Sequence, residues 1–209
     1  MIFNAWTRAA CAALFFFPAA GLPQAPKPAA PKQNVAQRAE TCFACHGAKG
    51  QSQLPLTPSL GAQPSFFVVA QLFLFRDARR GNAPAAMTEA ARTLTDDDLR
   101  AFADLISKLP PPPPSGKPPD AQKFARGRAL VLNQNCTTCH NPDLSGREQM
   151  PRLANQREDY LLKALRDYKS GARLGYGGAM AEELSTLKDA DLVDLANFLA
   201  YLPAKPVAK

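Results

Sequence analysis

The chain has 209 residues, 46% of them apolar, and 25 lysine and arginine against 18 aspartate and glutamate residues, which gives a formal net charge of +7. This apolar content is enough for packed cores and excludes a disordered or collagen-like chain. The sequence contains only two histidines, with five cysteines and four methionines. Two histidines exclude a His₃ zinc site, and a Ser-His-Asp triad alongside a separate histidine-rich metal centre.

Residues 1–21 are predicted to be a secretory signal peptide. One positive charge in Met1–Arg8 precedes the nine-residue apolar run Ala9–Phe17, and Ala19-Ala20-Gly21 supplies small residues suited to cleavage. The run is shorter than the roughly 20 apolar residues that span a bilayer. An uncleaved N-terminal anchor is the alternative. We therefore expect export, with Cys11 removed together with the signal, followed by a mobile Pro/Ala-rich leader at residues 22–32.

Two predicted helices end in the same motif. The first, Val35–Cys45, leads into Cys42-Phe43-Ala44-Cys45-His46, and the second, Ala121–Cys139, into Cys136-Thr137-Thr138-Cys139-His140. The pattern C-x-x-C-H is typical of c-type haem attachment, because each thiol adds to one vinyl group and the adjacent imidazole lies under the iron. The alternatives are a thioredoxin-like disulfide, or a zinc site built from both cysteine pairs. Neither explains why histidine follows both pairs.

The remaining predicted helices also come in pairs. Apolar residues at helical spacing predict helices at Ser65–Arg76 and Glu158–Lys169. A last helix is predicted from Thr95 to Pro110, because Asp96, Asp97 and Asp98 provide the negative charge that favours a first turn. Its counterpart is predicted at 188–202. No segment of the sequence predicts a strand, so the fold class is all-α.

A proline-rich segment at residues 110–120 is predicted to be a semi-rigid linker, because Pro110–Pro114 are consecutive prolines. The flanking segments, 33–109 and 121–203, are copies of one unit, which indicates an internal duplication. The register pairs Pro58-Ser59-Leu60 with Pro151-Arg152-Leu153, Gln63 with Gln156, Phe67 with Tyr160, Arg80 with Arg173, and Met87 with Met180. Residues 204–209 form a C-terminal tail. Each unit is small for an independent core, so we expect a covalently bound haem to supply much of the apolar interior.

The methionines complete the expected iron ligands. Met87 and Met180 lie 41 and 40 residues after His46 and His140, in the stretch before each last helix. A thioether there is suited to the second axial position, the alternative being a gap-filling core residue. Met150 has no methionine equivalent in the first unit, and we interpret it as a packing residue.

Residues 33–203 resemble a dihaem class I c-type cytochrome of the cytochrome c4 type: two C-x-x-C-H motifs, each followed by Pro-x-Leu, a middle helix and a distal methionine. The sequence departs from the family at Asn141-Pro142, where the family usually has glycine. The resemblance implies two tandem class I domains, each a small helical fold around a covalent haem, and electron transfer in the periplasm. It implies that the carbonyls of Pro58 and Pro151 orient the proximal histidines. It also places Arg80 and Arg173 near the haem propionates, the alternative being exposed, solvated arginines.

The expected ligand sets are His46 with Met87 and His140 with Met180, and the thioether bonds are expected at Cys42, Cys45, Cys136 and Cys139. An iron with both axial positions filled has no vacant site for a substrate, so we expect an electron carrier and not an enzyme. A fixed subunit of a dehydrogenase or oxidase complex is the main alternative, and a dihaem peroxidase or thiosulfate-oxidising enzyme is another.

The expected partners are redox proteins, such as a terminal oxidase, a cytochrome bc1-type complex or a dehydrogenase. Four haem propionates would offset much of the basic surplus, and no basic run predicts nucleic-acid binding. The charge pattern fits either mixed, solvated helix faces or a weakly basic docking face for an acidic partner. We expect membrane contact only indirectly, or through an uncleaved N-terminus.

Overall fold

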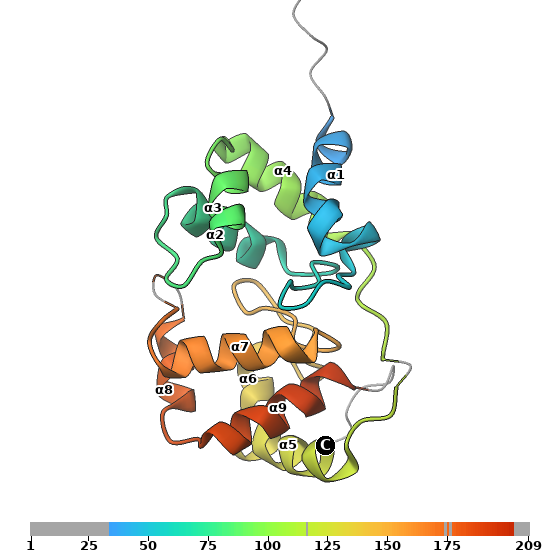
Figure 1. Ribbon diagram of the computed structural model, residues 1–209, viewed down its shortest axis with the longest axis vertical. Helices are drawn as coiled ribbons and strands as arrows, with labels where there is room; N and C mark the ends of the chain where they lie inside the picture. The colour runs from blue at the N-terminus through green and yellow to red at the C-terminus, as the bar shows by residue number, and fades with distance from the viewer. Residues whose placement is uncertain (1–33, 116, 174, 176, 203–209) are drawn as a thin grey trace, which may run out of the picture. The chain divides into compact units, whose positions relative to one another are not determined.

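The computed structural model describes residues 34–115, 117–173, 175 and 177–202 (Figure 1). The predicted signal peptide, leader and C-terminal tail, with Cys11, lie outside these residues. The described residues belong to one compact unit. Every regular element in the described ranges is a helix, and β-pairing there is limited to one isolated bridge between Arg147 and Met150. The predicted all-α fold class is confirmed.

The helices follow one plan twice. The first half contains α1 (Val35–His46), the short 3₁₀ helix η1 (Ala48–Gly50), α2 (Ser65–Arg76), α3 (Ala85–Ala91) and α4 (Asp96–Ser107). The second half contains α5 (Ala121–Asn133), α6 (Cys136–His140), α7 (Glu158–Lys169), α8 (Gly178–Leu184) and α9 (Asp189–Ala200). Helices α7, α8 and α9 begin and end 93 residues after α2, α3 and α4. The repeat inferred from the sequence is therefore reproduced at the helix boundaries.

Two features of the helices differ from the predictions. The short helices α3 and α8 were not predicted. The prediction of a single helix at Ala121–Cys139 is wrong, because this segment forms two helices, α5 and α6. The break lies at Asn135, which adopts a left-handed backbone with φ of 52°. Asparagine tolerates this conformation better than most residues. In α1 the equivalent position is Thr41, whose β-branched side chain disfavours the left-handed region, and α1 continues without a break.

The last helix of each half begins with a side-chain cap, and in α4 this cap is reciprocal. Thr95 Oγ1 accepts from the amide of Asp98 at 3.2 Å, and the Asp98 carboxylate accepts from the amide of Thr95 at 2.9 Å. In α9 the Asp191 carboxylate accepts from the amide of Lys188 at 2.7 Å. These contacts satisfy amide groups that the first turn of a helix leaves without partners. They explain why the predicted starts of both helices are confirmed.

Helices α5 and α9 of the second half cross at Gly127. A Cβ atom at this position would lie 2.2 Å from the carbonyl oxygen of Asp194 and 2.6 Å from Cβ of Phe198. The close approach lets Phe124 pack on Phe198, with ring centroids 4.9 Å apart. Arg126 adds a bidentate ion pair to the Asp194 carboxylate, at 2.6 and 2.9 Å. The main apolar cluster of the second half is built on this crossing.

The first half replaces this crossing with a charged contact. Its buried apolar cluster is small, comprising Val68, Ala103 and Ile106. The guanidinium of Arg38 in α1 lies over the ring of Phe102 in α4, 5.2 Å from the centroid, and forms an ion pair with Asp98. Phe102 is thereby covered, with 5% of its surface exposed. The connection between α1 and α4 therefore depends on a charge pair as well as on apolar packing.

The proline-rich segment lies against the first half. A Cβ atom at Gly61 would be 2.1 Å from the carbonyl oxygen of Pro110, and Gln51 Nε2 donates to the carbonyl of Pro111 at 3.5 Å. Pro112 is buried. None of the described helices is both long enough and apolar enough to cross a membrane.

We predict that Gly127→Ala destabilises the haem-loaded protein by about 1–3 kcal/mol, because the new methyl overlaps the backbone of α9. Thermal or denaturant unfolding measures this loss. Gly178→Ala is the matched control, because nothing lies within 4 Å of a Cβ at that helical position. Equal stability of the Gly127→Ala and wild-type proteins would contradict the close packing of α5 on α9.

We predict that Asp98→Asn costs about 1 kcal/mol at neutral pH, through the ion pair and the cap. The hydrogen bond from Arg38 holds the pKa of the Asp98 carboxyl well below its ordinary value. A lowered pKa contributes stability above the unfolded-state pKa of about 3.9, and this contribution is lost as the pH falls below that value. The difference between variant and wild type should therefore shrink in acid.

Melting temperatures measured from pH 7 to pH 3 test this prediction. Asp97→Asn is the matched control, because Asp97 lies in the same helical turn with 92% of its side chain exposed. A difference between Asp98→Asn and wild type that stays constant with pH would contradict it.

Candidate haem sites

Both histidines of the C-x-x-C-H motifs are buried and oriented in the same way. His46 ends α1 and His140 ends α6, with 5% and 3% of their surfaces exposed. Nδ1 of His46 lies 2.8 Å from the carbonyl oxygen of Pro58, and Nδ1 of His140 lies 2.8 Å from that of Pro151. A carbonyl oxygen only accepts, so each Nδ1 carries the proton and donates it. The lone pair of each ring is thereby assigned to Nε2.

The surroundings of the imidazoles suit metal ligation. Burial lowers the pKa of both histidines, which favours the neutral ring that binds metals. Nε2 of His140 is buried and has no hydrogen-bond partner among the described residues. A buried lone pair without a partner is costly unless a metal or a donor meets it. This arrangement fits a haem iron.

The four motif cysteines are unpaired thiols, as thioether attachment requires. Cys42 and Cys136 are partly buried, whereas Cys45 and Cys139 are exposed. Burial raises the pKa of Cys42, and it raises that of Cys136 to about 11. Among the described residues, no group of three or more His, Cys, Asp or Glu side chains is placed to hold a metal ion. The arrangement gives no support to the disulfide or the zinc alternative.

Met87 and Met180 occupy equivalent places. Each is the third residue of its short helix, Met87 in α3 and Met180 in α8. Both side chains are partly buried, and Met180 packs against the apolar cluster of the second half. Met150 lies instead in a tight turn, where its backbone exchanges two hydrogen bonds with Arg147, at 2.7 and 3.0 Å. An equivalent turn is present in the first half, where the amide of Thr57 donates to the carbonyl of Leu54 at 3.2 Å, so that a threonine stands at the position of Met150.

Arg80 and Arg173 lie between aromatic rings and polar groups of both halves. The guanidinium of Arg80 lies 4.4 Å from the ring centroid of Phe75, and that of Arg173 lies 4.5 Å from that of Tyr168. Across the two halves, Arg80 donates to the hydroxyl of Tyr160 at 3.5 Å, and Arg173 donates to Oε1 of Gln71 at 3.0 Å. With 8% of its surface exposed, Arg173 is not the solvated arginine of the alternative interpretation.

This arginine pair forms a positive site in which Arg173 is buried and Arg80 is partly buried. Burial lowers the pKa of Arg80, and neither guanidinium forms an ion pair with a carboxylate in the described part of the chain. Nε of Arg173 and Nε2 of Gln71 are buried without hydrogen-bond partners there. Burial opposes ionisation of Tyr160, yet Arg173 and Arg80 outweigh it and lower the pKa of that phenol. The site therefore suits an anionic group, such as a haem propionate.

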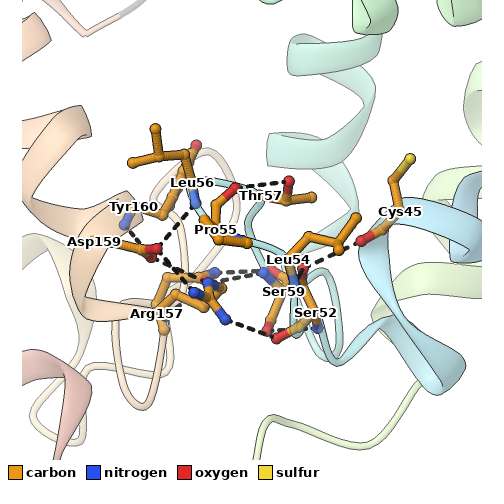
Figure 2. A network of polar contacts seen from close by, with 11 residues as sticks. Cys45, Ser52, Leu54, Pro55, Leu56, Thr57, Ser59, Arg157, Asp159 and Tyr160 are labelled. Carbon is orange, nitrogen blue, oxygen red and sulfur yellow. Dashed lines mark hydrogen bonds and ion pairs between the residues drawn. The ribbon is translucent and has the colours of Figure 1, made fainter.

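A second set of contacts joins the loop after η1 to the start of α7, and Figure 2 shows it. The amide of Leu56 donates to the carboxylate of Asp159 at 3.0 Å, and Arg157 donates to the carbonyl of Ser52 at 3.4 Å. Arg157 and Asp159 also form an ion pair at 2.8 Å. Further on, Asn82 Nδ2 donates to the Asp167 carboxylate at 2.8 Å.

Two glutamines also form hydrogen bonds between the halves. The amide of Ser59 donates to Oε1 of Gln156 at 2.7 Å, and the amide of Arg152 donates to Oε1 of Gln63 at 3.0 Å. Sequence reasoning placed both glutamines in the repeat register but gave them no role. Their equivalence in the two copies was the available signal.

Comparison with known proteins agrees with this geometry. The family model described as cytochrome c matches residues 124–203. A thiosulfate dehydrogenase electron acceptor from Thiomonas intermedia is 33% identical over 181 residues, which cover 80% of this chain and 81% of the relative. The chain belongs to the cytochrome c4 family. Cytochrome c4 from Thiocapsa roseopersicina is 28% identical over 85% of this chain and 95% of its own length. The crystal structure of reduced cytochrome c4 from Pseudomonas stutzeri matches with a TM-score of 0.72 and 26% identity, covering 81% of this chain and 97% of that one.

Membership of the cytochrome c4 family confirms three of the predictions. The fold is that of class I c-type cytochromes, the cofactors are covalently bound haem c groups fitted by the two C-x-x-C-H motifs, and the protein is an electron-carrying dihaem cytochrome.

Proposed function

We propose that this protein carries single electrons between redox proteins of the periplasm, and that it is not itself an enzyme. One haem would be held by residues 33–109 and the other by residues 121–203, joined by the linker at 110–120. The observation that carries the proposal is the repeated donor set: each half has one buried histidine with its proton on Nδ1, and one methionine at the third position of equivalent short helices.

In this proposal His46 and Met87 are the axial ligands of the first iron, and His140 and Met180 are those of the second. Cys42 and Cys45 attach one haem, and Cys136 and Cys139 attach the other. Bound haem supplies a one-electron couple at its iron. The carbonyls of Pro58 and Pro151 fix the imidazole planes, and burial of both rings keeps water from competing for Nε2.

Arg80 and Arg173 would neutralise haem propionates between the two halves. A buried and a partly buried guanidinium group without carboxylate partners are costly unless anions approach them. The contacts with Tyr160 and Gln71 hold both guanidinium groups in place for that role. A positive site beside a haem also favours the added electron, which contributes to a high reduction potential.

The function of one relative suggests the electron donor. Because the Thiomonas intermedia relative is a thiosulfate dehydrogenase electron acceptor, we propose a periplasmic dehydrogenase that oxidises thiosulfate as donor, and a terminal oxidase as acceptor. A cytochrome bc1-type complex is an alternative donor. The same relative also favours the second candidate function, a subunit fixed within a dehydrogenase complex.

We predict that Met87→Ala and Met180→Ala each remove about half of the weak far-red absorption band of methionine-ligated ferric haem, because each removes one thioether ligand. Absorption spectra of the oxidised variants measure the loss. Met150→Ala is the matched control and should leave the band intact. An undiminished band in both ligand variants would contradict the assignment.

The same samples test whether the protein is an enzyme. Reduced wild-type protein should not bind carbon monoxide, because both axial positions are filled, whereas each ligand variant should bind it at one haem. Ready binding of carbon monoxide by the wild type would overturn the electron-carrier proposal in favour of a dihaem enzyme.

Rapid mixing with a thiosulfate dehydrogenase and thiosulfate tests the donor. We expect both haems to be reduced completely, and only when the dehydrogenase is present. If charged faces guide docking, the rate of reduction should fall as the ionic strength rises. Size-exclusion chromatography of the mixture separates the two candidates, because a mobile carrier elutes alone and a fixed subunit elutes with the dehydrogenase. If the dehydrogenase and thiosulfate together do not reduce the haems, the dehydrogenase is excluded as the electron donor.

A further inference from the structure

Gln156 and Gln63 each pair with one backbone residue of the opposite half. Gln156 accepts from the amide of Ser59 at 2.7 Å and donates from Nε2 to the carbonyl of the same residue at 2.8 Å. Gln63 accepts from the amide of Arg152 and donates to its carbonyl, both at 3.0 Å. The two donor and acceptor contacts fix the orientation of each side-chain amide. Each glutamine has only 5% of its surface exposed, so water does not compete for these bonds.

The backbone amides that meet these glutamines belong to the peptide groups that hold the histidines. The peptide between Pro58 and Ser59 accepts from Nδ1 of His46 through its carbonyl, and donates to Gln156 through its N–H. The peptide between Pro151 and Arg152 does the same with His140 and Gln63. One planar peptide group therefore separates each histidine from a glutamine of the other half.

We propose that Gln156 tunes the reduction potential of the haem in the first half, and that Gln63 tunes that of the haem in the second half. The inference rests on the proposed function, because it requires His46 and His140 to be iron ligands. Neither glutamine touches a haem in this proposal; both are positioning residues that act through a peptide group.

The physical link is the resonance of the peptide bond. A hydrogen bond accepted from the N–H draws charge toward the carbonyl oxygen, and linked hydrogen bonds of this kind strengthen one another. A more negative carbonyl oxygen holds the Nδ1 proton of histidine more strongly and makes the imidazole a better electron donor. A better donor stabilises ferric iron, which lowers the potential. Removing the glutamine acceptor should therefore raise the potential of the haem in the opposite half.

The crossed arrangement separates this effect from local damage. A substitution that merely disturbs its surroundings acts first on the haem of its own half, and a looser contact between the halves acts on both haems. Polarisation through the peptide acts on the haem of the other half alone. Gln156 and Gln63 provide this test in both directions within one molecule.

The experiment compares Gln156→Leu, Gln63→Leu and wild type as haem-loaded full chains. Leucine has a similar volume and no hydrogen-bonding group. The midpoint potential of each haem is followed by NMR of partly oxidised samples, and the proton shift of each histidine Nδ1–H is recorded in the reduced state. Asn82→Ala is the control. It removes a side-chain hydrogen bond between the halves, and that bond involves neither of the two peptide groups that accept from a histidine.

We expect Gln156→Leu to raise the potential of the first haem only and to move the His46 Nδ1 proton upfield, the sign of a weaker hydrogen bond. Gln63→Leu should do the same for the second haem and His140. Unchanged potentials, a shift confined to the haem of the variant's own half, or equal shifts that Asn82→Ala reproduces would each overturn the inference. If a leucine variant does not assemble, Gln156→Asn and Gln63→Asn, each one methylene shorter, carry the same expectation.

Failure of the proposed function would give a different experimental result from failure of the glutamine role. If His46 or His140 is not an iron ligand, the wild-type protein lacks the spectrum of a histidine- and methionine-ligated haem in that half. A normal wild-type spectrum together with absent crossed shifts overturns only the role of the glutamines.

Discussion

The hydrogen bond from each C-x-x-C-H histidine to a proline carbonyl is the contact on which the arrangement of the candidate haem sites depends. It fixes the tautomer of His46 and His140, leaves the lone pair of each ring on Nε2, and ties the end of α1 or α6 to the loop that follows. Because the donor is a buried ring, the bond has no competing water. The loops that carry Pro58 and Pro151 are also the segments that meet Gln156 and Gln63 of the opposite half. The orientation of the motif histidines and the joining of the two halves thus depend on the same short stretches of backbone.

The two halves share a plan but differ in how it is stabilised. The second half has a full helix crossing at Gly127 and a continuous apolar cluster, whereas the first half has a small cluster and the Arg38–Asp98 ion pair. The difference follows from the sequence before each motif. Residues 22–32, before the first motif, are rich in proline, which disfavours the interior of a helix, whereas the second half carries the beginning of α5 before its motif.

Much of the fold could be predicted because its signals are local. The apolar spacing of α2 and α7 and the aspartates at the start of α4 determine those helices with little help from distant residues. The break at Asn135 and the seven-residue helices α3 and α8 could not be predicted in this way, since both depend on packing around neighbouring elements. The candidate ligands were found because residue type and repeated position carried the signal. The glutamine contacts join residues 89 and 97 positions apart, and no sequence periodicity describes such a pairing.

The contact of the proline-rich segment with the first half affects how readily the two halves associate. Because Pro110 and Pro111 are held against Gly61 and Gln51 and Pro112 is buried, the part of the chain left to act as a tether is the stretch from Pro113 to Asp120. Even fully extended, such a segment reaches only about 30 Å. A tether of this length keeps the opposing surfaces at an effective concentration on the order of millimolar, so contacts that open are re-formed far faster than two separate molecules would meet. The polar contacts between the halves therefore only have to outweigh a separation limited by the tether. They do not have to bring together two molecules from dilute solution.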